Sequence, residues 1–231
     1  MEQGGTSDVL FRVFGLEVTG AVTTMWAVMA LVIAVLWLAA RRIERIPRSR
    51  AQSLVEIAIA GGENLFSSVM SPRRTRQFLP LLGSFFAFIL VCNYSGLIPG
   101  AGEFRGFKPP TSHWGVTAGL AAIAFLATQY AGIRSKGLRY FRHFVEPLFL
   151  APLMLPLSMI EELVRPFSLS LRLFANIFGG ETVLLALLLV IPYFLPITVL
   201  VLELIFGFVQ AFIFTLLTAV YLAGASETQG H

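Results

Sequence analysis

Three long stretches without any charged side chain constrain the fold of this chain most strongly. Residues 21–40, 78–98 and 114–133 contain no Asp, Glu, Lys or Arg. A helix needs about 20 mainly apolar residues to cross the ~30 Å hydrocarbon core of a membrane. Because 56% of the whole chain is also hydrophobic, the sequence predicts an all-α polytopic membrane protein.

The N-terminal residues and the single cysteine exclude several classes of protein. The first 20 residues lack a basic region and carry Glu2, Asp8 and Glu17 before an apolar run too long for a secretory signal. We therefore expect no cleaved segment. Cys92 lies inside an apolar run, which excludes an internal disulfide and a cysteine metal cluster. We expect neither a metal nor a cofactor.

The basic residues predict the orientation of the chain. Eight of them lie between residues 41 and 76 and four between 134 and 142, which makes 12 of the 17 Lys and Arg residues. By the positive-inside rule these loops are cytoplasmic, the N-terminal segment 1–20 is external, and the C-terminus is cytoplasmic. The basic residues border apolar runs, so orientation explains the positive net charge better than binding of a nucleic acid.

Residues 51–70 have a different pattern from the spans. Leu54, Ala58 and Leu65 lie near one helical face, while Gln52 and Glu56 lie elsewhere. This pattern predicts an amphipathic helix along the cytoplasmic membrane interface. A helix that binds a partner protein is the alternative.

The last two apolar segments, within 144–191 and 197–225, are too long to stand upright in a membrane. Residues 157–191 would form about 52 Å of helix, and residues 197–225 about 43 Å, at 1.5 Å per residue. Both lengths exceed the ~30 Å core, so we expect two steeply tilted, antiparallel helices. Pro166 is one place to bend. Residues 144–160 contain three prolines, which predict an irregular start to the first of these segments.

Arg172 is the most informative polar residue because it lies in the middle of an apolar stretch. A charge at the bilayer centre costs roughly 2.5 to 3.5 kcal/mol on insertion scales, so such a residue is a functional candidate. At helical spacing Ser168, Arg172 and Asn176 share one stripe. Glu161, three turns before Arg172, returns to nearly the same stripe.

Four carboxylates are distributed on both sides of Arg172. Glu161 and Glu162 lie toward the cytoplasmic start of the helix, and Glu181 and Glu203 lie toward the outer turn. Gln210 shares a helical face with Glu203. A buried carboxylate can exchange a proton near neutral pH, whereas an arginine stays protonated. The pattern therefore predicts two proton or cation pathways separated by a fixed positive charge.

Structural interpretations exist for several of these residues. Arg165 can pair with Glu161 or Glu162, and Gly179 and Gly180 can allow close helix packing. Asn176 and Gln210 can form hydrogen bonds between helices. His113 fits a solvated outer loop, and His143 and His231 have no predicted role.

Two other functions compete with an ion pathway. A secondary transporter would use Arg172 to bind an anionic substrate, and it predicts broken helices around a midplane pocket. A non-conducting scaffold would leave the charged residues without purpose. The sequence contains no nucleotide-binding loop or catalytic triad, so we expect no catalytic activity in this chain.

Several segments resemble the a subunit of F-type ATP synthases. The resemblance lies in the segment from Ser168 to Asn176, in Gly179-Gly180-Glu181, and in the segment from Gln210 to Thr218 with Tyr221. The group Asn93, Gly96, Leu97 and Pro99, and the pair Pro110-Thr111, also fit this family.

This resemblance implies the non-catalytic stator of a rotary motor in an energy-transducing membrane, such as a bacterial inner membrane. Arg172 would face a ring of c subunits, each with a membrane carboxylate. Asn176 and Gln210 would accompany the arginine. Glu181 and Glu203 would line the outer half-channel, and Glu161 and Glu162, with Ser168 a weaker candidate, the cytoplasmic one. The implied partners are the c-ring, b-type peripheral stalk subunits, the remaining complex and the lipid bilayer.

The chain departs from the family pattern at several positions. Ala175 stands where many members have Gly, Gly96 where some have a carboxylate, and His113 where many have Asp. Another common variant has His in place of Glu203. Proton uptake here could therefore depend on carboxylates alone.

Overall fold

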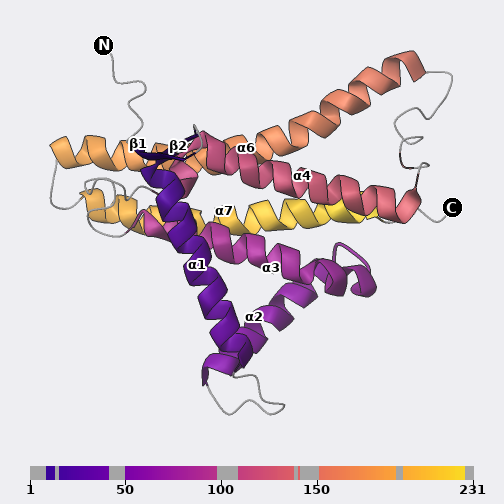
Figure 1. Ribbon diagram of the computed structural model, residues 1–231, viewed down its shortest axis with the longest axis horizontal. Helices are drawn as coiled ribbons and strands as arrows, with labels where there is room; N and C mark the ends of the chain where they lie inside the picture. The colour runs from indigo at the N-terminus through magenta and orange to yellow at the C-terminus, as the bar shows by residue number, and fades with distance from the viewer. Residues whose placement is uncertain are drawn as a thin grey trace.

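The computed structural model describes residues 9–13, 16–41, 50–97, 109–137, 140, 151–190 and 195–226. Six helices form most of these residues (Figure 1): α1 (Gly20–Arg41), α2 (Arg50–Ser67), α3 (Pro72–Ser95), α4 (Trp114–Lys136), α6 (Ala151–Val190) and α7 (Leu195–Ser226). The 3-10 helix η1 (Pro110–Ser112) precedes α4. The predicted helical class is confirmed. The structure adds an antiparallel hairpin of β1 (Val9–Val13) and β2 (Leu16–Thr19), which the sequence did not predict.

Four helical segments are long and apolar enough to cross a membrane: Pro72–Ser95, Trp114–Lys136, Leu155–Leu189 and Ile197–Ser226. A shorter apolar helical segment, Val22–Leu38, lies within α1. These five segments correspond to the five predicted membrane helices.

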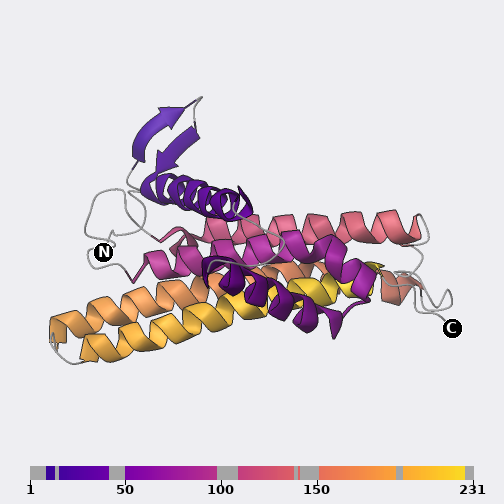
Figure 2. The ribbon, with the colours of Figure 1, turned by 90° about the horizontal axis from the view of Figure 1, so that it is seen from below.

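The helices form two groups by direction. Helices α3, α4, α6 and α7 run alongside one another, whereas α1 crosses them steeply (Figure 1). The antiparallel pair α6 and α7 projects beyond α3 and α4 at the end where α6 stops and α7 begins (Figures 1 and 2). With 40 and 32 residues, they measure about 60 and 48 Å. Because both lengths exceed the ~30 Å core, these helices must tilt strongly in a membrane.

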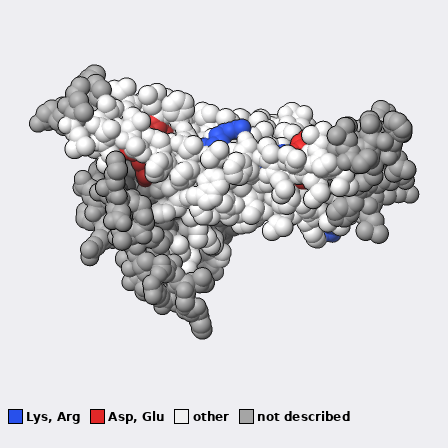
Figure 3. Space-filling view, turned by 90° about the horizontal axis from the view of Figure 1, so that it is seen from above, with Lys and Arg blue, Asp and Glu red and all other residues white. Residues whose placement is uncertain are grey.

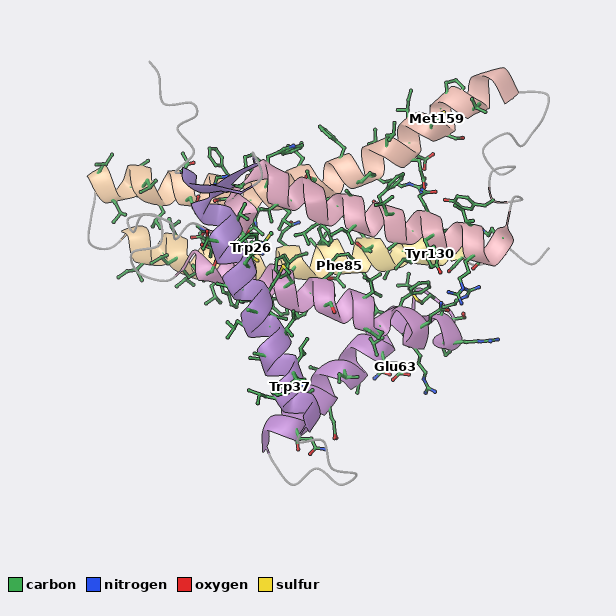
Figure 4. All side chains as sticks on the ribbon, viewed as in Figure 1. Trp26, Trp37, Glu63, Phe85, Tyr130 and Met159 are labelled. Carbon is green, nitrogen blue, oxygen red and sulfur yellow. The ribbon has the colours of Figure 1, made fainter. Side chains whose placement is uncertain are left out.

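Aromatic and aliphatic side chains fill the space between the aligned helices. The Phe85 ring of α3 (Figure 4) meets the Phe214 ring of α7 edge to face, with centroids 5.7 Å apart. Ile89 of α3 and Leu173 of α6 are fully buried in the same cluster. These contacts fix α6 and α7 against α3 and α4.

Basic side chains bind the carboxyl end of α7. Lys136 donates to the carbonyl oxygen of Gly224 at 3.1 Å, and Arg74 to that of Ser226 at 3.4 Å. Cations at a helix C-terminus also interact favourably with the helix dipole. The start of α3 and the ends of α4 and α7 therefore lie together. The predicted orientation also puts these three helix ends on one side of the membrane.

The predicted irregular stretch over residues 144–160 is wrong for residues 151–160, which are helical. Pro152 lies in the first turn of α6, where a backbone N–H has no helical partner to lose. Pro156 and Pro166 lie inside the helix. The part of α6 that carries Met159 diverges from α4 (Figure 4). Residues 144–150 lie outside the described residues.

The buried contact between α7 and its neighbours predicts a large difference between two leucines. Leu222 is fully buried, whereas Leu126 is 63% exposed. Leu222→Ala should reduce the free energy of unfolding by about 2 to 5 kcal/mol through the cavity it leaves. Leu126→Ala should have a far smaller effect. Thermal unfolding in detergent measures both, and equal losses would contradict this packing.

Candidate functional site

Arg172 lies on the exposed side of α6, next to the buried core. Leu173 is fully buried while Leu171 is 43% exposed, and the Arg172 side chain is exposed. Among the described residues, no hydrogen-bond or ion-pair partner of the Arg172 guanidinium is present. The fold therefore leaves this charge available at its surface.

The antiparallel packing of α6 and α7 determines which residue of α7 lies at the same height as Arg172 along the helix axes. Asn176 donates from Nδ2 to the carbonyl oxygen of Phe206 at 3.4 Å. Because the helices are antiparallel, four residues back along α6 correspond to four residues forward along α7. Arg172 thus lies at the level of Gln210. The Gln210 side chain is buried, and its Nε2 has no hydrogen-bond partner within the described part of the chain.

The carboxylate of Glu203 lies at a close crossing of α6 and α7. Its side chain is only 7% exposed, and its Oε1 lies 3.2 Å from the position that a Cβ on Gly180 would occupy. Glu181, the next residue on α6, is half-buried. Gly180 thus permits the close approach expected from the sequence, whereas a Cβ on Gly179 would meet open space.

Helix α3 completes this region with Asn93, which was known from the sequence only as part of a resemblance, and with Tyr94, which the sequence did not predict. Asn93 donates from Nδ2 to the carbonyl oxygen of Gly207 at 3.0 Å. Tyr94 donates from its hydroxyl to the carbonyl oxygen of Leu204 at 3.3 Å. The Asn93 side chain is buried, and its Oδ1 has no partner in the described residues. Unpaired buried amide groups can bind ordered water.

The other pair of carboxylates, at the start of α6, is held by Arg165. Its Nη2 lies 2.6 Å from Glu161 Oε1, and its Nη1 lies 3.1 Å from Glu162 Oε2. The predicted pairing of Arg165 with Glu161 or Glu162 is confirmed, and the structure contains both contacts. Two partners of Glu162 were not predicted: Gln129 of α4 donates to it at 2.7 Å, and the Tyr140 hydroxyl lies at 3.5 Å.

Charged patches are few on the side of the molecule that carries α6. In Figure 3 this face is mostly uncharged, with a basic patch near the middle and acidic patches on both sides along the long axis. Ser168, on the predicted stripe with Arg172, is half-buried. His113, also half-buried, precedes α4 and lines a cavity between α1, α3 and α4.

Sequence comparison extends over most of the chain. The family model described as ATP synthase A chain matches residues 22–223. The chain belongs to the ATP synthase A chain family. The "ATP synthase subunit a" of Moorella thermoacetica is 41% identical over 93% of this chain and 94% of its own length. "ATP synthase subunit a 1" of Syntrophotalea carbinolica is 42% identical over 89% of this chain and 85% of its own.

A third relative, "ATP synthase subunit a" of Geobacter sulfurreducens, is 36% identical over 90% of this chain and 87% of its own length. Family membership and the apolar helices make this ATP synthase A chain protein an integral membrane protein. They also disfavour a secondary transporter. Within the described residues α6 and α7 are continuous helices at Arg172 and Gln210, whereas a transporter site would require broken ones.

Proposed function

We propose that this subunit is the stator of a rotary F-type ATP synthase and carries two ion half-channels against the c-ring. The observation that supports this most strongly is Arg172, an exposed charge on an apolar surface with no partner in the described residues. A ring carboxylate can supply the missing counter-charge, one subunit at a time. A permanently paired arginine could not bind each carboxylate in turn.

The outer half-channel uses carboxylates and amides of α3, α6 and α7. Glu181 and Glu203 take up the ion, and Asn176 and Gln210 accompany Arg172 at the ring. Burial of Glu203 next to Gly180 supports this path, as does the unpaired amide of Gln210 at the level of Arg172. Asn93 adds a polar group beside Gly207, which lies between Glu203 and Gln210 on α7.

The cytoplasmic half-channel begins on the other side of Arg172. An ion that has travelled around the ring is displaced from its carboxylate by Arg172 and leaves past Ser168 toward the exposed carboxylate Glu161. Each charge that crosses 100 mV releases about 2.3 kcal/mol, so several ions are needed for each ATP. The subunit itself is non-catalytic, and partner subunits make ATP.

A second partner fits the apolar groove between α1, α3 and α4, which has a volume of about 700 Å³. Its lining includes Met25, Met29 and Phe88, together with Gly115 and Gly119. Glycines four apart on a membrane helix allow another helix to approach closely, and a Cβ on either would meet open space. We assign this groove to a membrane helix of a b-type peripheral stalk subunit.

The orientation follows the basic residues. The ends of the helices that carry Arg74 and Lys136 face the cytoplasm, together with the carboxyl end of α7. The N-terminus is then external and the C-terminus cytoplasmic. The membrane is a bacterial inner membrane or a comparable energy-transducing membrane.

Disulfide cross-linking to the ring tests this function. Leu171 is exposed beside Arg172, so Leu171→Cys should form a disulfide with a cysteine placed next to the ring carboxylate in the complete complex. The cross-link should stop ATP-driven ion transport until it is reduced. The matched control is Leu126→Cys, an exposed position on α4. Failure of Leu171→Cys to cross-link, or equal cross-linking of both positions, would contradict the assigned ring surface.

A further inference from the structure

The neighbouring carboxylates Glu161 and Glu162 have very different surroundings. The Glu161 side chain is 65% exposed, and its contact with Arg165 is the one ion pair it makes within the described residues. The Glu162 side chain is 15% exposed. One residue of helix turns Glu162 about 100° away from Glu161, and this rotation carries it inward toward α4.

Three groups from three parts of the chain hold Glu162. Gln129 of α4 and Tyr140 donate to Glu162 Oε1, and Arg165 of α6 binds Oε2. Burial raises the pKa of Tyr140, and the charge of Glu162 adds to this effect. The hydroxyl therefore stays protonated and available as a donor. A carboxylate that is bound by three fixed donors has little tendency to change partners.

The structure also fixes the partners of Glu162. Tyr140 packs against Gly132, where an added Cβ would come within 2.5 Å of the ring. The guanidinium carbon of Arg165 lies 5.5 Å from the centre of the Tyr221 ring of α7. This cation–π contact and the two carboxylates hold Arg165 between α6 and α7.

Little water can reach Glu162 from the interior of the bundle. The cavity beside it, bordered by Thr128, Arg165 and Tyr221, has a volume of about 10 Å³. This space holds no more than about one water molecule. Glu161, in contrast, is exposed and lies near the stripe of the exposed Arg172 and the half-buried Ser168.

We propose that the two carboxylates have separate roles: Glu161 exchanges protons at the cytoplasmic half-channel, and Glu162 anchors Arg165, a positioning residue that orients Glu161. This inference rests on the proposed function. The proton released by a ring carboxylate binds Glu161 and then passes to water on the cytoplasmic side. Arg165 remains charged throughout, and Glu162, Gln129 and Tyr140 transfer no proton.

The test compares Glu161→Gln with Glu162→Gln in the complete complex, in vesicles that pump protons with ATP. Rates are divided by the amount of assembled subunit. Glu161→Gln should slow pumping roughly tenfold or more, because a positioned proton acceptor is lost. Glu162→Gln should slow it less than about twofold and should leave the dependence on cytoplasmic-side pH as in the unmodified protein.

Arg165 variants provide a readout that a purely structural role would not produce. Arg165→Gln should alter the dependence of pumping on cytoplasmic-side pH, since Arg165 is the charged group that faces Glu161. Arg165→Lys keeps this charge and should restore most of the original profile. If Glu162→Gln prevents assembly, the double variant Glu162→Gln/Arg165→Gln removes both charges and is measured instead. It should pump faster than Glu161→Gln.

Two results would overturn separate roles for the carboxylates. The first is that Glu162→Gln, or the double variant, pumps protons as slowly as Glu161→Gln. The second is that Arg165→Gln leaves the dependence of pumping on cytoplasmic-side pH unchanged. Arg172→Ala, measured in parallel, separates this failure from failure of the proposed function. If Arg172→Ala also pumps normally, the stator function itself is wrong.

Discussion

Arg172→Ala should abolish ATP-driven ion transport while the amount of assembled subunit stays unchanged. The Arg172 side chain is exposed and has no partner among the described residues, so the fold does not depend on it. Removal of a fixed charge that acts on a passing carboxylate should lower the pumping rate by more than about 100-fold. Acidification of vesicles on addition of ATP measures the rate.

The matched control is Arg134→Ala. Arg134 is also exposed, at the end of α4, and its guanidinium donates to the Tyr130 hydroxyl of the same helix. Its loss should change pumping little. Retained pumping in Arg172→Ala, or an equal loss in both variants, would contradict a specific role for Arg172 at the ring.

Glu203→Gln should slow passive ion flow through the membrane sector by about tenfold, because the path loses a carboxylate that exchanges protons. Glu203 is buried against Gly180 at the crossing of α6 and α7. Gln210→Glu should slow this flow less, since it keeps a polar side chain of the same length. The measurement uses an imposed ion gradient after the ATP-hydrolysing part has been removed.

Glu63→Gln is a control that replaces a glutamate outside the proposed half-channel in the same way as Glu203→Gln. Glu63 pairs with Arg76 of α3 at 2.8 Å, and the arginine side chain is 77% exposed. Glu63 lies on α2, away from α6 (Figure 4). Glu63→Gln should leave passive flow unchanged. An effect of Glu203→Gln no larger than that of Gln210→Glu would argue against the outer half-channel.

The membrane helices could be predicted because apolar length is a local property of the sequence. Uncharged runs of about 20 residues predicted the spans, and the excess length of the last two predicted a tilted antiparallel pair. The irregular start expected for α6 was wrong because proline rules depend on position. A proline in the first turn of a helix removes no hydrogen bond, so Pro152 is compatible with helix.

The site could be predicted only where its residues share one helix. Helical spacing predicted the stripe of Ser168, Arg172 and Asn176 and the pairing of Arg165 with Glu161 or Glu162. Contacts between helices depend on packing that spacing does not determine. The bonds from Gln129 and Tyr140 to Glu162 therefore became visible only in the structure. They distinguish two carboxylates that are equivalent in the sequence.

Passive proton leak through Arg172→Ala complexes tests the central claim most directly. The leak is measured in vesicles that contain the complete ATP synthase, with nucleotide turnover inhibited so that the ring cannot rotate. If Arg172 separates the two half-channels, the variant should leak protons at least about tenfold faster than the unmodified complex, because the barrier of a fixed charge is lost. A leak equal to that of the unmodified complex would contradict the separating role of Arg172.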